Sequence, residues 1–107
     1  ERLTRAELIQ TVGGAQPMAK LNEKFFYNNV MFAAAGEISA VVNKTTWEKY
    51  IPERIFKPLG MTNSTMTIPE MKKAADFSFG YDYNFDTKET RRLPFRSIEA
   101  TNPAGSI

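Results

Sequence analysis

The residues of this sequence best placed to do chemistry are a tyrosine and an asparagine that precede a long apolar segment. Tyr27 and Asn29 stand two positions apart, and the residues from Val30 onward predict a helix. A helix start favours negative charge, because its first N–H groups are unpaired and its dipole is positive there. A phenolate is therefore better tolerated at this place than elsewhere. With an amide beside it, the pair has the composition of a general base next to a substrate-binding group.

The same residues also have a purely structural explanation. Asparagine is one of the commonest residues at helix N-caps, so Asn28 or Asn29 can cap the predicted helix. In this interpretation Tyr27 only packs and Asn29 only caps. Local pattern alone favours the structural role, because N-cap asparagines are so common.

Other kinds of site are poorly represented. The sequence has no histidine and no cysteine, which removes the commonest general base, the thiolate nucleophile and the commonest metal ligands. Gly13-Gly14 is not followed by the Gly-Lys-Ser/Thr of a phosphate-binding loop. Asp82 and Asp86 fall in a predicted hairpin, where we expect solvated charges rather than a carboxylate pair. We therefore expect no cofactor and no metal.

Capping boxes of the form Thr-x-x-Glu predict three helix starts, at Thr4, Thr45 and Thr67. The first predicts a helix over residues 5–12, which Gly13-Gly14 ends. The second predicts a helix that ends before Pro58, because a residue that precedes proline is disfavoured in helical geometry. The third predicts a short helix to about residue 75, with proline in its first turn.

The longest predicted helix, from Asn29 to Val42, is apolar nearly all round, with only Glu37 and Ser39 as interior polar residues. Such a helix is normally buried at the centre of a larger body. Gly36 inside it costs about 1 kcal/mol relative to alanine, which predicts close approach of another backbone. The rest of the chain offers few elements to surround this helix, so we expect partner structure outside the chain.

Aromatic residues at every second position from Phe77 to Phe85 have the period of a β-strand. Residues 86–89 are turn-like, and residues 90–95 predict the return strand. Because a lone hairpin is only marginally stable, we expect one face of it to lean on the helices or on absent structure. Residues 96–107 are expected to be irregular, with a turn at Asn102-Pro103-Ala104-Gly105. The fold class is thus mainly α with a small hairpin (α+β), in a single unit of residues 1–107.

Composition is that of an ordinary soluble domain, with 42% apolar and 24% charged residues. The 14 basic and 12 acidic residues are dispersed, and Arg91-Arg92 is the only arginine pair, which argues against a nucleic-acid partner. No apolar run approaches the roughly 18 residues that a membrane span requires. The lack of cysteine suits periplasmic, secreted and cytoplasmic proteins equally. We expect Glu1 and Ile107 to be the boundaries of an excised piece.

Three stretches, in this order, resemble the serine β-lactamase-like (penicillin-binding-protein-like) family, which includes class C β-lactamases, related esterases and D-amino-acid peptidases. Residues 26–38 resemble the family's Tyr-x-Asn motif and the central helix after it. Residues 50–64, YIPERIFKPLGMTNS, resemble a helix followed by Pro-Leu-Gly-Met and then Thr/Ser. Residues 102–107 resemble the Pro-Ala-Gly-Gly/Ser turn that opens a later family helix. The shared order and spacing make the joint match strong.

The resemblance implies roles for two residues. Tyr27 would be the family's acid/base and Asn29 its substrate-orienting amide. A nearby lysine ammonium would have to favour the phenolate, which would then help to take the nucleophile's proton. Backbone N–H groups would form an oxyanion hole. The implied activity is hydrolysis of amide or ester bonds, in a β-lactam, a D-alanyl peptide or an ester, through an acyl-enzyme.

The family's nucleophile lies in a Ser-x-x-Lys motif, normally upstream, and a Lys/His-x-Gly motif lies downstream. This sequence contains neither. No lysine stands three residues after any of the serines, which are Ser39, Ser64, Ser78, Ser97 and Ser106. We therefore expect the chain to be the helical subdomain of a β-lactamase-like fold, inactive alone and completed by the remainder of the parent chain, which would bind a small-molecule or peptide substrate.

Two alternatives stay open. The parent can be a catalytically dead relative that binds peptidoglycan fragments, peptides or proteins, since fold does not fix function. The chain can also be a free-standing interaction module whose apolar helix pairs with another chain. The first alternative predicts a replaced nucleophile, and the second predicts a stable isolated fold that oligomerises with concentration.

Overall fold

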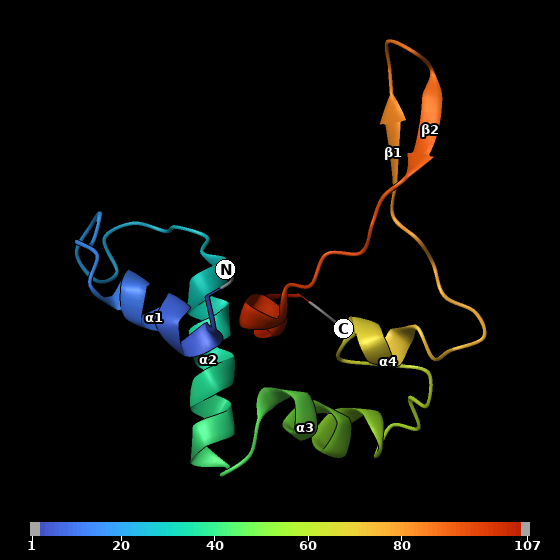
Figure 1. Ribbon diagram of the computed structural model, residues 1–107. Coiled ribbons are helices and arrows are strands. Elements are labelled where there is room, and N and C mark those ends of the chain that lie inside the picture. The colour runs from blue at the N-terminus through green and yellow to red at the C-terminus, as the bar shows by residue number, and fades with distance from the viewer. Residues whose placement is uncertain (1–2, 106–107) are drawn as a thin grey trace.

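The computed structural model describes residues 3–105, in which helices make up one group and a hairpin stands apart from them (Figure 1). The order of elements along the chain is α1 (Arg5–Gly13), α2 (Asn29–Val42), α3 (Trp47–Ile51), η1 (Pro52–Phe56), α4 (Ile68–Met71), β1 (Tyr81–Asn84), β2 (Glu89–Arg92) and η2 (Glu99–Ala104). Here η1 is one π-helical turn and η2 is a 3₁₀ helix. The predicted fold class, mainly α with a small hairpin, is confirmed.

The first helix, α1, begins with the predicted capping box. The backbone N–H of Thr4 donates to Glu7 Oε2 at 2.8 Å, and the Glu7 N–H donates to Thr4 Oγ1 at 3.3 Å. The hydrogen bond from the Thr4 backbone, with a second one from its hydroxyl, lowers the pKa of Glu7 below its usual range. The helix ends at Gly13, one residue beyond the predicted end.

The second helix, α2, has the predicted bounds, but its burial differs from the prediction. Only the small residues Ala33, Gly36 and Ala40 are buried. They lie three or four positions apart and form one stripe along the helix. Large apolar side chains on the remaining surface are exposed, and they are Met31, Phe32, Ile38, Val41 and Val42. The described residues therefore cover one face of α2 and leave an apolar face uncovered.

Gly36 is explained by a close contact, although its neighbour is a side chain rather than the predicted backbone. A Cβ placed on Gly36 would lie 2.3 Å from Pro103 Cγ and 3.2 Å from Trp47 Cε3. Only glycine leaves room for the Pro103 ring against α2. This contact seats η2 on the helix, and residues 96–107, which were expected to be irregular, contain the 3₁₀ helix Glu99–Ala104. Ser106 and Ile107 lie outside the described residues.

The second predicted capping box is wrong. The N-cap of α3 is Thr46 rather than Thr45, and its side chain makes no capping hydrogen bond. The predicted partner, Glu48, instead receives hydrogen bonds from Arg5 and Asn102. A charge-assisted bond to a guanidinium is stronger than a bond to a neutral backbone N–H, so the long-range partners prevail.

The helical segment after Thr46 ends before Pro58 as predicted, but it is not one regular helix. Pro52 has no N–H to donate to the carbonyl four residues earlier, so the α-helical pattern ends at Ile51. The chain continues as a π-turn, in which Lys57 N–H donates to the Pro52 carbonyl at 2.9 Å. The turn brings Phe56 back toward Ile51.

A small core lies beneath this segment. Ile51, Phe56 and Met66 are buried together, and Trp47 and Tyr50 pack against them. Met66 immediately precedes the third predicted helix start, which is confirmed. The Thr67 side chain accepts from the Glu70 N–H at 3.3 Å, but α4 ends at Met71 rather than near residue 75.

The hairpin is antiparallel, with Tyr81 opposite Arg92 and Asn84 opposite Glu89. Its first strand begins at Tyr81 instead of Phe77. Tyr81 and Phe85 are 61% and 84% exposed, and the strands extend away from the helices (Figure 1). The hairpin therefore does not lean on the described helices, and its other expected support, structure outside this chain, stays a prediction.

Aromatic packing occurs instead at the base of the hairpin. The rings of Phe77, Phe79 and Phe95 form a cluster with centroid distances of 5.0 to 6.0 Å. The Arg92 guanidinium lies over the Phe79 ring, and the Lys72 ammonium lies 5.1 Å from the centroid of Phe95. Cations over aromatic faces are favourable contacts, and here they join the end of β2 and the segment after α4 to the cluster.

The described chain is open for its length. Its radius of gyration is 17.3 Å, whereas a compact domain of this length has about 13 Å. The small core, the contact of α2 with η2 and the base of the hairpin are three separate packing centres. Residues 3–105 therefore do not close around one core.

Candidate active site

The N-terminus of α2 is built by Asn28. This residue has extended backbone angles, φ −148° and ψ 112°, and its Oδ1 accepts a hydrogen bond from the Val30 N–H at 2.8 Å. Its carbonyl accepts from the Met31 N–H at 3.1 Å, which begins the backbone ladder. An N-cap side chain of this kind satisfies one of the otherwise unpaired donors of the first turn.

Tyr27 stands immediately before the cap and packs on the fourth residue of the helix, Phe32. Their ring centroids are 5.6 Å apart and the rings are tilted by 42°. An apolar contact between the residue before the N-cap and the fourth helical residue is a hydrophobic staple, which fixes the direction in which the chain enters a helix. The Tyr27 side chain is nevertheless 68% exposed, so the staple holds the ring without burying it.

Asn29 is the first residue of the helix and is not its cap. Its side chain is exposed and has no hydrogen-bond partner among residues 3–105. The structural explanation for Asn29 is thereby removed, because Asn28 performs that role. Of the three residues in Tyr27-Asn28-Asn29, the middle one builds the helix end, and the outer two present side chains that the cap does not use.

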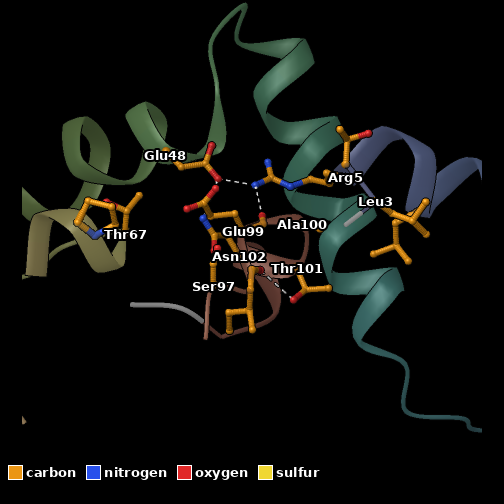
Figure 2. Close-up of a pocket in the computed structure, with 13 residues that line it drawn as sticks. Leu3, Arg5, Glu48, Thr67, Ser97, Glu99, Ala100, Thr101 and Asn102 are labelled. Atoms are coloured by element: carbon orange, nitrogen blue, oxygen red, sulfur yellow. Dashed lines mark hydrogen bonds and ion pairs between the residues drawn. The ribbon is translucent and has the colours of Figure 1, made fainter. Parts of the chain in front are cut away.

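A partly buried arginine connects α2 to the rest of the helical group. Arg5 Nη1 lies 3.2 Å from Glu37 Oε2 of α2, and Arg5 Nη2 pairs with Glu48 Oε1 of α3. The same Nη2 donates to the Glu99 carbonyl of η2 at 3.0 Å. In Figure 2 the Arg5 side chain reaches across to Glu48, with η2 beside it. One guanidinium thus joins four elements.

Glu48 is the centre of this network. Burial alone raises the pKa of its carboxyl, but hydrogen bonds from Arg5 and from Asn102, the latter at 3.0 Å, outweigh that effect and lower the pKa. The carboxylate is therefore held ionised between α1, α3 and η2. Its role is to fix η2, and with it Pro103, against α2.

The network borders an open hollow of about 800 Å³ (Figure 2). Arg5, Glu48 and Asn102 line it, together with residues of η2 and the start of α4, whereas Tyr27 and Asn29 do not. Arg5 and Glu48 are already paired with each other, so this part of the hollow has the character of a structural junction. The candidate catalytic residues lie at a different place, at the start of α2.

Several residues that the chemistry requires are not brought to Tyr27. Phe32 is the partner of Tyr27 in the described part of the chain, and neither a serine nor a lysine joins them. Asp82 pairs with Arg91 at 2.8 Å across the hairpin, so Asp82 and Asp86 do not act as a carboxylate pair. Within residues 3–105 no group of three or more potential ligands forms a metal site, and no helix is long and apolar enough to cross a membrane.

The sequence did not identify Phe32 as the contact of Tyr27, or Arg5 and Asn102 as partners of Glu48. Phe32 had a usable signal, because it stands five residues after Tyr27, the spacing of a hydrophobic staple. The partners of Arg5 lie 32, 43 and 94 positions away, so no local pattern reports them.

Comparison with known proteins places these features in a family. The model of the beta-lactamase family matches residues 1–107, which is the whole chain. The chain belongs to the beta-lactamase family. A "Beta-lactamase" from Psychrobacter immobilis is 32% identical over 76 residues, which are 71% of this chain and 19% of that protein. "Gigasin-6" from Magallana gigas is 26% identical over 65 residues, which are 60% of this chain and 22% of that protein.

A solved structure is similar to this chain in fold as well as in sequence. The octameric penicillin-binding protein homologue from Pyrococcus abyssi superimposes with a TM-score of 0.77 and 31% sequence identity, over 86% of this chain and 21% of that chain. The resemblance to a β-lactamase-like and penicillin-binding-protein-like family is thereby confirmed. The chain spans about a fifth of the length of the relatives it matches.

Proposed function

We propose that this chain is the helical part of a longer serine hydrolase of the beta-lactamase family, which cleaves amide or ester bonds through an acyl-enzyme. Tyr27 acts in that protein as the acid/base, and Asn29 orients the substrate. The remainder of the parent chain supplies the nucleophilic serine, its lysine and the Lys/His-x-Gly strand. A β-lactam, a D-alanyl peptide and a small ester are the candidate substrates.

The observation that carries this proposal is that Asn28 caps α2, whereas Tyr27 and Asn29 take no part in the cap. Asn28 alone satisfies the cap, so Tyr27 and Asn29 remain exposed and without hydrogen bonds to the described residues. Polar side chains left unused at a well-formed helix end are available to a substrate.

The proposed chemistry assigns one proton transfer to this chain. The phenolate oxygen of Tyr27 accepts the proton of the serine hydroxyl while the serine oxygen attacks the carbonyl carbon of the substrate. Tyr27 later gives this proton to the leaving group. The Asn29 amide donates to, or accepts from, a polar group of the bound substrate. The lysine that keeps Tyr27 ionised belongs to the parent's Ser-x-x-Lys motif.

The uncovered face of α2 supports a larger parent. Met31, Ile38 and Val42 lie on one side of the helix and are 56%, 64% and 74% exposed. Contiguous apolar surface of this kind marks an interaction site. We propose that the missing part of the beta-lactamase domain covers it.

Covalent labelling of the intact protein tests the proposal. The protein and the isolated 107-residue chain are each treated with a fluorescent penicillin and with a fluorophosphonate, and intact masses are measured. We expect one adduct on the intact protein and none on the isolated chain. If the folded intact protein gains no adduct with either probe, the acyl-enzyme proposal is wrong and a binding protein of the same fold takes its place.

Replacement of Tyr27 tests its role separately. Tyr27→Phe in the intact protein keeps the ring of the staple and removes only the hydroxyl, so we expect turnover to fall by about 10²–10⁴-fold, the usual contribution of a general base, with little change in stability. Tyr81→Phe is the matched control, because Tyr81 is also exposed but lies on the hairpin. Unchanged turnover in Tyr27→Phe would exclude the acid/base role.

A further inference from the structure

The contact between Tyr27 and Phe32 constrains a side chain that little else holds. The Tyr27 ring is 68% exposed, and its interaction with described residues is the ring contact at 5.6 Å. An exposed tyrosine with no such contact would sample several rotamers about its first side-chain bond. The Phe32 ring occupies one side of Tyr27 and so limits the rotamers that the phenol can adopt.

The two residues are coupled through the helix end as well as through their rings. Asn28, which separates them, is fixed by its hydrogen bond to the Val30 N–H at 2.8 Å. The cap sets the backbone direction at Tyr27, and the staple sets the direction of the ring. Phe32 is itself held, because the backbone of α2 is seated by Pro103 against Gly36, one turn further along.

We infer that Phe32 is a positioning residue, which holds the Tyr27 phenol in the orientation that the proposed reaction needs. This inference rests on the proposed role of Tyr27. A general base must lie within hydrogen-bond reach of the proton that it takes. Since a misplacement of about 1 Å can reduce a rate by roughly 10²-fold, a residue that fixes the ring affects turnover without touching the substrate.

A purely structural Phe32 would behave differently. If its ring only stabilised α2, its removal would lower the stability of the protein and leave the turnover of the folded fraction unchanged. If it positions Tyr27, its removal lowers kcat, leaves KM nearly constant and changes the environment of the Tyr27 ring. The two roles are therefore separable by the kcat and KM values of folded protein and by a spectroscopic signal of Tyr27.

The experiment uses the intact protein with Phe32→Ala, Phe32→Tyr and Ile38→Ala. Ile38 is the matched control, because it is a large apolar residue of the same helix that makes no ring contact with Tyr27. It lies on the face that the missing part of the domain is proposed to cover, so Ile38→Ala reproduces a loss of helix packing without touching the Tyr27 ring. We expect kcat to fall roughly 10-fold to 100-fold in Phe32→Ala and to stay near that of the unaltered protein in Phe32→Tyr and Ile38→Ala. The ring signal of Tyr27, identified in spectra of ¹³C-tyrosine-labelled protein by its loss in Tyr27→Phe, should shift only in Phe32→Ala.

Each outcome bears on one proposal. If Tyr27→Phe is inactive while Phe32→Ala keeps both its kcat and the Tyr27 ring signal, the positioning role is overturned and the proposed function stands. If Tyr27→Phe is fully active, the proposed function fails, and a shifted ring signal in Phe32→Ala still shows that the staple orients the phenol. Should Phe32→Ala not fold, Phe32→Leu keeps apolar bulk on the helix but removes the ring that contacts Tyr27. In that variant kcat should fall and the Tyr27 ring signal should shift, and an unchanged kcat and ring signal would overturn the inference.

Discussion

The ring of Pro103 occupies the space that a side chain on Gly36 would need, since a Cβ there would lie 2.3 Å from Pro103 Cγ and 2.4 Å from Pro103 Cβ. The two residues are 67 positions apart in the sequence and join η2 to α2. Both contact atoms belong to a ring that is closed onto the backbone, so they cannot move aside by a rotamer change. A substitution at Gly36 must therefore shift η2 relative to the helix.

Gly36→Ala in the intact protein should be destabilising even though alanine is the better helix former. The propensity gain is about 1 kcal/mol, whereas overpacking of a tight contact typically costs about 1–3 kcal/mol. We expect a net loss in the free energy of unfolding, measured by urea denaturation. Gly13→Ala is the control, because a Cβ at Gly13 meets nothing within 4 Å, and it should be neutral or stabilising.

A second variant shows whether the Pro103 ring is the cause. Pro103→Gly removes both atoms that clash, Cγ and Cβ, so Gly36→Ala combined with Pro103→Gly should lose less stability than the sum of the single changes. If the two effects simply add, the Pro103 ring does not oppose the new methyl group and the explanation is wrong.

Glu48 should make the stability of the protein depend on pH in the acidic range. Its pKa is lowered from the ordinary 4.5 in the folded state, so folding favours the ionised carboxylate. The stabilisation is therefore fully present above the unfolded-state value and is lost as the pH falls through the lower folded-state value. Glu48→Gln removes this ionisation, and its free energy of unfolding should approach that of the unaltered protein as the pH falls from 7 to 3.

Arg5 provides the internal check on this pH dependence. Arg5→Met removes the guanidinium but leaves the Glu48 carboxyl where burial raises its pKa. The folded-state pKa of Glu48 then moves up toward, or above, its unfolded-state value, so acidification should cost Arg5→Met less stability than it costs the unaltered protein. If Arg5→Met and the unaltered protein show the same pH profile of unfolding, the ion pair does not set the behaviour of Glu48.

The N-cap threonines of α1, α3 and α4 should respond differently to alanine. Thr4 and Thr67 accept hydrogen bonds from the N–H groups of Glu7 and Glu70, whereas Thr46, the actual N-cap of α3, makes no such bond. We expect Thr4→Ala and Thr67→Ala each to lower the free energy of unfolding by about 1 kcal/mol, with a much smaller loss for Thr46→Ala. Chemical denaturation of the three variants of the intact protein checks this order, and equal losses would contradict it.

The three predicted capping boxes show what the sequence alone could predict of the fold. Thr4 and Glu7 form their box because no distant group competes for either side chain. The identical pattern at Thr45 fails because Glu48 pairs with Arg5, which lies 43 positions away. A short sequence motif shows only the hydrogen-bond partners that lie nearby in the chain, not distant partners that compete for the same side chain. The sequence therefore predicted the bounds of α2 but not the Arg5 and Glu48 network that holds η2 against it.

The π-turn at Pro52 was also not predicted, although the residue that causes it lies within the predicted helix itself. A proline five residues into a helix removes one backbone hydrogen bond, and the chain responds with the π-turn of η1. The separation of the hairpin from the helices could not be predicted in this way. Alternating aromatics from Phe77 to Phe85 specify a strand period, but they do not say whether this chain or another part of the parent covers the exposed rings.

For the candidate site, the motif identified Tyr27 and Asn29 but did not decide which asparagine caps the helix. Both asparagines are good caps by residue type. The choice depends on backbone geometry, since Asn28 is extended and Asn29 is already helical. Phe32 was predictable in principle from its spacing to Tyr27, whereas the seating of α2 by Pro103 needed the three-dimensional structure.

The assignment of Asn28 as cap and Asn29 as free amide leads to opposite expectations for the two neighbours. Asn28→Ala removes the acceptor of the Val30 N–H and should lower the free energy of unfolding by about 1 kcal/mol, whereas Asn28→Ser keeps a cap of similar quality. Asn29→Ala removes no hydrogen bond to the described residues, so stability should change little. Its turnover should fall sharply, because the substrate loses its amide partner.

Paired measurements on the intact protein separate these effects. Thermal unfolding and steady-state kinetics are measured for Asn28→Ala, Asn28→Ser and Asn29→Ala. We expect a stability loss for Asn28→Ala with a smaller fall in kcat/KM than for Asn29→Ala, and a normal midpoint with strongly reduced kcat/KM for Asn29→Ala. If Asn29→Ala lowers stability as much as Asn28→Ala and leaves kcat/KM unchanged, then Asn29 is a structural residue and the substrate-orienting role belongs to another part of the protein.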